Sequence, residues 1–203
     1  KYRNLSDMAG AIGKITLVDS NELRNWLLDS TVWSKFGMNS TYLLTYFIPN
    51  TYELYWTTTS EGFIKRMKKE YDRFWTSERK ENEKDLGLTI EQVSVLASIV
   101  NEETIKTDEK PKVAGLYWNR VNKGMLLQAD PTVKFALGNF ELRRIWEKDL
   151  QVNSPYNTYR YKGLPPGPIN TPSIEDLEAV LNLNKHNFIY IKWDKHYTLS
   201  YSF

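Results

Sequence analysis

Two adjacent glutamates follow an apolar stretch in the segment LASIVNEET. If this stretch is a helix, each residue advances about 100° around the axis, and one stripe is formed by Val93, Leu96, Ile99 and Val100. Glu103 then lies about 20° from Leu96, inside that stripe. Asn101 and Glu102 lie more than about 100° from Leu96, on either side. We therefore predict that Glu103 points inward and that its two neighbours face solvent or the edge of the stripe.

An inward glutamate has a consequence for proton chemistry. A carboxylic acid on an apolar face loses hydration, which disfavours its charged form and raises its pKa unless polar partners compensate. A raised pKa is what a general acid requires at neutral pH. The residues alone leave an alternative open, in which the helix ends near Val100 and Glu103 is solvated or is paired with an arginine.

The beginning of this helix can be predicted from the segment LTIEQV. Thr89 suits the N-cap position and Gln92 falls at the third helical position, so the two residues form a capping box. Leu88 and Val93 occupy the positions of a hydrophobic staple. These signals predict a helix that starts next to Thr89.

Composition indicates a globular chain and disfavours one class of partner. The 203 residues are 41% hydrophobic and 14% aromatic, and 27 basic against 25 acidic side chains leave a net charge of +2. Because this balance creates no strong field, we do not expect nucleic acid as a partner. No apolar run approaches the roughly 18 residues of a membrane span, and the sequence does not begin with methionine, so we expect a fragment whose leader or anchor is absent.

The residues that usually bind metals or act as nucleophiles are scarce. The chain has no cysteine, which excludes disulfides, thiol nucleophiles and thiolate metal sites. The only histidines, His186 and His196, have poor spacing for a metal site. A serine triad would need one of them, and neither is accompanied by a G-x-S-x-G elbow. We therefore predict no metal and no cofactor.

Hydrophobic periodicity and turn residues divide the chain into mainly helical segments. A small α-rich piece is expected up to about residue 29, and the aromatic stretch 41–56 is expected to form strand-turn-strand or a loop. Further helices are expected at 59–84, 89–103, 110–123, 141–150 and from Pro172, and a hairpin with its turn at Asp194–Lys195 ends the chain. The predicted fold class is α+β, with a helical catalytic core and small β-hairpins.

Three segments of the chain together resemble one family. LASIVNEET…KPKVAGLYWNR, GMLLQADPTVKFALG and YNTYRYKGLPPGPINTP are similar to the blocks ASIVEKET…VAxVFxNR, GMxLQxDPTVxYxLG and YNTYxxxGLPPGPIxxP of the MltG/YceG-like endolytic murein transglycosylases. FIPNTYEL also resembles the upstream LFPDTYxF segment of that family. The similarity extends from about residue 46 to residue 191, in the order that the family has.

The resemblance implies a catalytic residue and a domain organisation. The catalytic glutamate of the family precedes threonine in EKET and falls on Glu103, whereas its other glutamate position is Asn101 here, which therefore cannot be required. Other departures are Asn50 for aspartate, Leu44-Thr45 for Glu-Gly, and an end at Phe203 before the closing helix of the family. By this resemblance, residues 1–29 are the end of a LysM-like subdomain with a connector, and residues 30–203 are the catalytic domain.

The resemblance also implies a reaction and a location. The enzyme would cleave the β-1,4 bond between N-acetylmuramic acid and N-acetylglucosamine within peptidoglycan strands, leave 1,6-anhydro ends and terminate nascent strands. The full protein would be anchored in the inner membrane of a bacterium, with its catalytic domain outside the cytoplasm and cell-wall synthases as partners. The residues expected to contact sugar are Asn119, Gln128, Asp130, Tyr156, Asn157 and Tyr159.

Two other functions remain open at this stage. One is a muramidase-type hydrolase that uses Asp130 as a second carboxylate beside Glu103. Because Asp130 precedes a proline, its simpler interpretation is an Asx-type turn that shapes the loop. The other function is a non-catalytic peptidoglycan-binding module in which Glu103 is structural.

Overall fold

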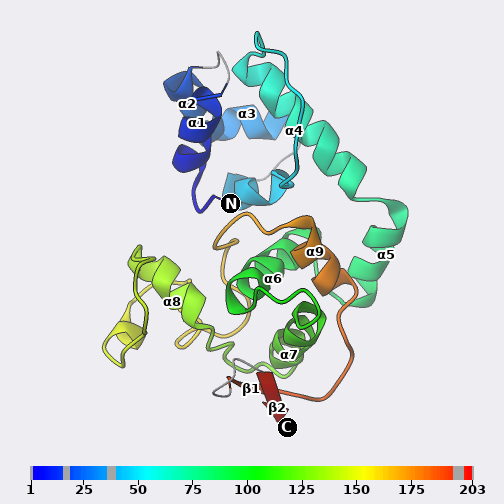
Figure 1. Cartoon of the computed structure of the whole chain (residues 1–203), viewed down its shortest axis with the longest axis vertical. Coiled ribbons are helices and arrows are strands. Elements are labelled where there is room, and N and C mark those ends of the chain that lie inside the picture. Colours follow the sequence, from blue (N-terminus) through cyan, green and yellow to red (C-terminus); the bar gives the residue numbers. More distant parts are fainter. Residues whose placement is uncertain (1, 16–18, 36–39, 194–198, 203) are drawn as a thin grey trace.

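The structure is a computed structural model that describes residues 2–15, 19–35, 40–193 and 199–202. Its helices form an upper and a lower layer, with an arm beside the lower layer (Figure 1). The chain begins between the two layers and ends below the lower one. None of the described helices is both long enough and apolar enough to cross a membrane.

The upper layer consists of α1 (Leu5–Gly13), α2 (Ser20–Leu28), α3 (Ser30–Lys35), the 3-10 helix η1 (Ser40–Tyr46) and α4 (Ser60–Phe74). Its core is aromatic, because the ring of Trp33 lies 6.4 Å from that of Tyr46 and 5.9 Å from that of Phe47. α1 packs on α2, and α2 also contacts α3 and α4. The domain boundary near residue 29 and the LysM-like character of the first residues stay predictions.

The lower layer is built around α6 (Ile90–Glu103). This helix packs against α7 (Lys110–Asn122) and α9 (Ile174–Leu181), and α5 (Ser77–Asp85) lies beside α6 and α9. All side chains from 93 to 100 are buried. The predicted capping box is confirmed, since the Thr89 N–H donates to Gln92 Oε1 at 2.8 Å and the Gln92 N–H donates to Thr89 Oγ1 at 3.2 Å. The central helix therefore starts where the sequence indicates.

The arm carries α8 (Asp130–Leu137) and the short 3-10 helix η2 (Asp149–Gln151), seen at the left of Figure 1. From the arm, a proline-rich loop, GLPPGPI at residues 163–169, returns to the central helix. There the Ile169 N–H donates to Ser98 Oγ at 3.0 Å, and Asn170 Nδ2 donates to the Ser98 carbonyl at 3.3 Å. The loop is thus fastened to the middle of α6.

The predicted α+β fold class is wrong, because the chain is helical. The only described strands are β1 (Tyr190–Trp193) and β2 (Leu199–Ser202), a single antiparallel pair at the end of the chain that forms no layer of its own. The turn expected at Asp194–Lys195 lies outside the described residues. No strand forms within the described part of 41–56, where η1 is followed by irregular chain. Its aromatic residues pack onto neighbouring helices, and this tertiary packing outweighs their β propensity.

Two helix predictions also need correction. The single helix expected at 59–84 is divided into α4 and α5, because Thr76 begins a new helix with its side chain accepting from the Arg79 N–H at 3.3 Å. The helix expected at 141–150 is absent from that stretch, which consists of turns and the start of η2. There the Trp146 N–H donates to Asp149 Oδ2 at 2.9 Å, a local side-chain bond that competes with helix formation.

Candidate active site

Glu103 is the last residue of α6 and points toward α7. The hydroxyl of Tyr117, on α7, donates to Glu103 Oε1 at 2.8 Å. Tyr117 is only 2% exposed, and Glu103 is partly buried. The inward direction predicted for Glu103 is therefore confirmed, and the helix continues past Val100 to reach it.

The surroundings of Glu103 favour its protonated form. All causes together raise its pKa to about 7; burial is the largest, and the hydrogen bond from Tyr117 opposes it. The negative charges of Asp130 and Glu102 contribute to the rise, while the positive charge of Arg120 opposes it. A carboxyl with a pKa near 7 is present in both protonation states at neutral pH, which is what a residue that first donates and then accepts a proton requires.

Arg120 lies near Glu103, but its donors bind main-chain oxygens. Its Nε donates to the Ile189 carbonyl at 2.6 Å and its Nη1 donates to the Leu127 carbonyl at 2.5 Å. Its guanidinium also lies 5.5 Å from the centre of the Tyr190 ring. Within the described residues, no lysine or arginine forms an ion pair with Glu103. The alternative in which an arginine neutralises the glutamate is therefore wrong for this part of the chain.

Three of the predicted sugar-contacting residues, Gln128, Asp130 and Tyr159, are here called the polar rim, and the last two interact electrostatically with Glu103. Gln128 and Asp130 are exposed at the start of α8, and Gln128 has a positive φ of 52°. The hydroxyl of Tyr159 donates to Asp130 Oδ1 at 2.5 Å. Burial and this bond raise the pKa of Tyr159 above its usual range, so the phenol remains a donor. The side chain of Asp130 thus binds Tyr159, and no Asx-type bond to backbone is among its contacts in the described residues.

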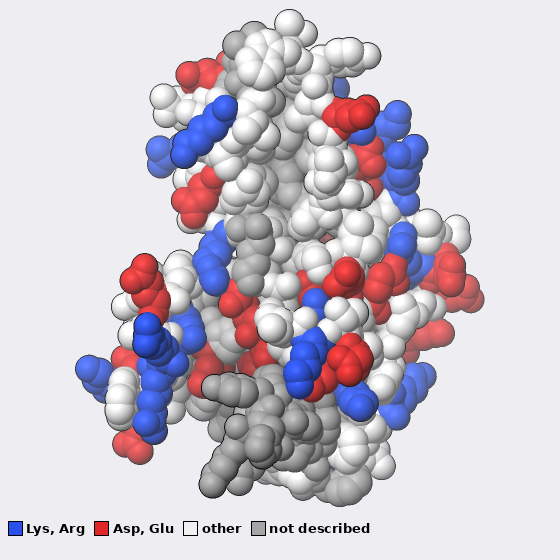
Figure 2. All heavy atoms as spheres, viewed as in Figure 1, with Lys and Arg blue, Asp and Glu red and all other residues white. Residues whose placement is uncertain are grey.

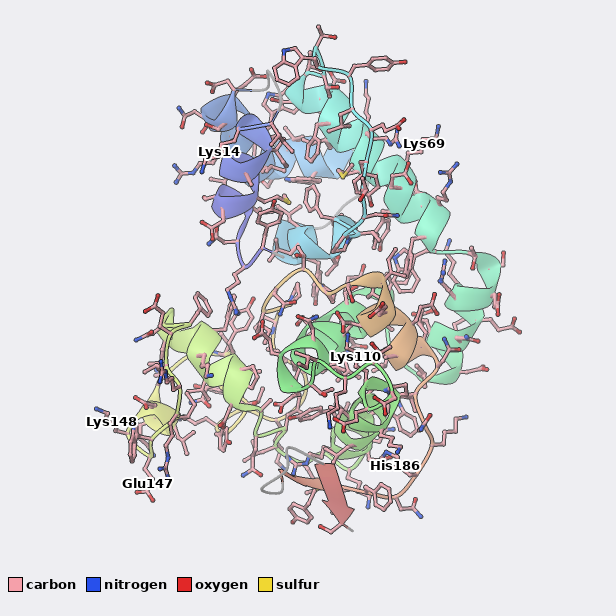
Figure 3. All side chains as sticks on the ribbon, in the orientation of Figure 1. Lys14, Lys69, Lys110, Glu147, Lys148 and His186 are labelled. Atoms are coloured by element: carbon pink, nitrogen blue, oxygen red, sulfur yellow. The ribbon has the colours of Figure 1, made fainter. Side chains whose placement is uncertain are left out.

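Two of the predicted residues hold other segments in place. The Nδ2 of Asn119 donates to the His186 carbonyl at 2.7 Å and to the Phe188 carbonyl at 3.0 Å, below α7 where Figure 3 labels His186. Asn157 is fully buried, and its Nδ2 donates to the carbonyls of Leu150 at 2.8 Å and Val152 at 2.9 Å. The described contacts of both amides are with the protein itself.

Tyr156 lines a pocket together with residues of the arm and of the upper layer. Its ring centre is 4.7 Å from that of Phe135, and burial raises the pKa of its phenol. Together with Arg3 and Pro168 it lines a pocket of about 290 Å³. No hydrogen bond between Tyr156 and Glu103 is among the described contacts, and the sugar contact of Tyr156 stays a prediction.

The face shown in Figure 2 is hollowed between the arm and the lower layer, and acidic atoms are visible there. Basic and acidic side chains alternate over the rest of that face. Among the residues that the structure describes, no three histidine, aspartate or glutamate side chains are arranged to hold a metal ion. The site is thus built from a carboxyl, phenols and amides.

The chain matches one protein family over almost its whole length. The model of the YceG-like family matches residues 1–202. The chain belongs to the YceG-like family.

Similar proteins agree with this assignment. The chain is 35% identical over 175 residues to an endolytic murein transglycosylase of Bacillus subtilis, a match that covers 84% of this chain and 47% of that protein. It is 33% identical over 157 residues to an endolytic murein transglycosylase of Streptococcus pneumoniae strain D39, covering 73% of this chain and 28% of that protein. The chain thus spans about half the length of the first relative and a smaller part of the second.

The fold is also that of a solved structure. A 2.6 Å crystal structure of a YceG-like protein from Listeria monocytogenes superposes with a TM-score of 0.83 at 27% sequence identity. The match covers 98% of this chain and 69% of the other chain. The layers and the arm are therefore an arrangement that another YceG-like protein shares.

The neighbours of Glu103 in this YceG-like chain have structural partners. Glu102 forms an ion pair with Arg3 at 3.2 Å and accepts from Asn170 Nδ2 at 2.8 Å, so it lies at the edge of the helix and not in open solvent. Asn101 Nδ2 donates to Asp176 at 2.6 Å. Both residues connect α6 to distant parts of the chain.

Sequence reasoning did not single out Tyr117 as a functional residue of the YceG-like site. A signal was present, because Tyr117 stands on the apolar stripe of the predicted helix 110–123, and a buried phenol usually needs a hydrogen-bond partner. The ion pair of Arg3 with Glu102 had no such signal, since the two residues are 99 positions apart.

Proposed function

We propose that this chain is the catalytic part of an endolytic murein transglycosylase that cuts peptidoglycan strands. The named activity of the relatives in B. subtilis and S. pneumoniae supports the proposal. Because the chain covers only part of those proteins, the activity of the whole protein stays a proposal as well.

One observation carries the proposal: a single partly buried carboxyl, Glu103, has a pKa raised to about 7 and no cationic partner among the described residues. A transglycosylase of this kind needs one group that acts first as acid and then as base. Ordinary glycosidases need two carboxylates for the same bond. The surroundings of Glu103 fit a mechanism in which one residue acts first as acid and then as base.

The proposed reaction uses a nucleophile that belongs to the substrate. Protonated Glu103 donates its proton to the glycosidic oxygen, and the bond from that oxygen to C1 of N-acetylmuramic acid breaks. The resulting carboxylate accepts the proton of the C6 hydroxyl, whose oxygen forms a new bond to C1. The product is a 1,6-anhydro end, and no water is consumed.

The polar rim of Gln128, Asp130 and Tyr159 is proposed to contact the sugars on either side of the cut. Amide, carboxylate and phenol groups can bind the hydroxyl and N-acetyl groups of the strand. Asn157 acts on this rim indirectly, because its Oδ1 accepts from the Tyr159 N–H at 3.0 Å. Asn119 is proposed to hold the segment that carries the carbonyl partner of Arg120.

The proposed substrate indicates where the protein acts. Peptidoglycan lies in the bacterial cell envelope, outside the cytoplasm, so the catalytic chain is proposed to act there. An anchor in the inner membrane and cell-wall synthases as partners are further proposals, which rest on the family resemblance alone.

A hydrolase remains the second candidate, and Asp130 is the observation in its favour. Its negative charge acts on Glu103 and raises the pKa of that carboxyl. In a hydrolase, Asp130 would activate water or attack C1. Its bond to Tyr159, 2.5 Å long, instead suits a rim residue that orients the phenol.

The test is the mass of the products from uncrosslinked glycan strands in heavy-oxygen water. The transglycosylase predicts unlabelled 1,6-anhydro ends that are one water lighter than hydrolytic ends. Heavy oxygen at the new reducing ends would establish the hydrolase, and a lack of products from a folded protein would indicate a binding module. Asp130→Asn should retain the anhydro products, with a loss in kcat/KM equivalent to about 0.5–3 kcal/mol, whereas loss of a true second carboxylate should abolish them.

A further inference from the structure

We infer that Tyr117 is a positioning residue for the acid, because its hydrogen bond fixes which oxygen of Glu103 faces the strand and sets the pH range of activity. This inference rests on the proposed function of Glu103. It assigns to one phenol on α7 a role that the relatives' names and the family match do not describe.

The geometry gives Tyr117 a single described partner. Its hydroxyl lies 2.8 Å from Glu103 Oε1, and its ring is 2% exposed. Its helix, α7, packs against α6, which carries Glu103. With Oε1 occupied by the phenol, Oε2 is the oxygen left to exchange a proton with the strand. Tyr117 thereby limits the rotation of the carboxyl group without touching the reacting atoms.

The phenol remains protonated across the working pH range. Burial raises the pKa of Tyr117 well above its usual value, and the adjacent charge of Glu103 raises it further. A donor that cannot lose its proton stabilises the carboxylate form of its partner. This is why the bond lowers the pKa of Glu103 against the effect of burial.

The other groups around Glu103 do not replace this donor. Asp130 on α8 and Glu102 on α6 raise its pKa through their charge, whereas Arg120 on α7 lowers it. The hydroxyl of Tyr159 is bound to Asp130. Among these neighbours, Tyr117 alone donates a described hydrogen bond to the glutamate.

Phenylalanine is a suitable replacement at this position. The ring of Tyr117 is 2% exposed, so a replacement has to fill the same buried space. The substitution Tyr117→Phe retains the buried ring and removes only the hydroxyl. The variant should therefore fold, and its effect should be confined to the lost hydrogen bond.

The experiment titrates the Glu103 carboxyl directly by carbon-13 NMR of protein labelled at the glutamate side-chain carboxyl carbon. Glu103→Gln identifies the signal by its disappearance. In Tyr117→Phe, the midpoint should move upward by about half to one pH unit, because one net hydrogen bond to the carboxylate is lost. Tyr71→Phe, which removes a buried phenolic oxygen from α4 in the upper layer, should leave the midpoint unchanged.

Kinetics on glycan strands provide the second measurement. The alkaline limb of kcat/KM should move upward with the midpoint, and kcat should fall about three- to tenfold with little change in KM. A midpoint and a pH profile equal to those of the wild type would overturn the inference and leave Tyr117 a packing residue. The titration needs no substrate, so it separates this failure from a failure of the proposed function, which product analysis of the wild type would reveal.

Discussion

Two carboxyl groups, one on α9 beside α6 and one at the end of α6, have opposite surroundings. Asp176, on α9, is 0% exposed and lies 2.8 Å from Lys110 Nζ, at the start of α7 where Figure 3 labels the lysine. It also accepts from Asn101 Nδ2 at 2.6 Å and from the N–H and hydroxyl of Ser173, both at 2.7 Å. Glu103, at the end of α6, has one described donor, the phenol of Tyr117.

The difference indicates a structural role for Asp176 and a role in proton transfer for Glu103. A buried charge with a cation and several donors is fixed in place, and removing one partner is costly. A buried carboxyl without a cation is instead free to exchange its proton, and strongly raised pKa values are typical of functional sites. The same helix region thus provides one carboxylate that holds the fold and one that is suited to catalysis.

The largest expected effect is on turnover. Glu103→Gln retains the shape of the side chain but cannot donate or accept the proton, so activity should fall by about 10²–10⁴-fold. The measurement is the rate of product release from glycan strands, with circular dichroism to verify the fold. Glu102→Gln is the matched control and should retain most activity, because Glu102 binds Arg3 and Asn170 instead of the substrate. Equal losses in both variants would contradict the assignment.

The second prediction concerns Asp176 and is measured in the free energy of unfolding. Asp176→Asn removes the nearer counter-charge of the buried Lys110 ammonium and leaves only the carboxylate of Glu175, at 3.8 Å. We therefore expect a loss of up to about 3–5 kcal/mol in urea denaturation. The double variant Asp176→Asn with Lys110→Met removes both charges and should recover part of this loss. If the single variant were as stable as the wild type, the ion pair would not hold α7 to α9.

The third prediction is that Glu103→Gln gains stability at alkaline pH. The pKa of Glu103 is higher in the folded chain, at about 7, than the value of 4.5 for a free side chain. As pH rises from 4.5 to 7, the unfolded chain therefore loses this proton first, and the wild type becomes less stable relative to the unfolded state. The neutral amide avoids this loss, which amounts to about 2–3 kcal/mol above pH 7 after allowance for partial exposure.

The check for this third prediction is thermal unfolding of both proteins at two pH values. At pH 8 the melting temperature of Glu103→Gln should exceed that of the wild type. Near pH 4 the two proteins should be close, since Glu103 is protonated in both the folded and the unfolded state. A constant difference at all pH values would mean that the gain does not come from proton binding.

Local signals predicted the central helix well. The capping box of Thr89 and Gln92 and the 3.6-residue period act within a few residues, so they determine the start of α6 and the inward direction of Glu103. The family resemblance and the helical wheel also selected the same glutamate by separate arguments. The part of the site formed by one helix could therefore be predicted.

Tertiary partners could not be predicted in this way. The bond from Asn101 to Asp176 joins residues 75 positions apart, and no local pattern indicates it. The aromatic stretch that follows η1 has residues of high β propensity, but these pack against helices of the upper layer. The hydrogen bonds of Asn119 have the same origin, because the carbonyls that it binds belong to residues 186 and 188. Its contact with sugar stays a prediction.

The central claim is that Glu103 starts the reaction in its protonated form, and the pH dependence of kcat/KM for the wild type tests it most directly. The rate on uncrosslinked strands is measured from pH 5 to 9, because the profile reports the pKa of the acid in the free enzyme. With a pKa of about 7 for Glu103, kcat/KM should fall as pH rises through that value. A rate that stays constant from about pH 5 to 8 would contradict a general acid with the environment of Glu103.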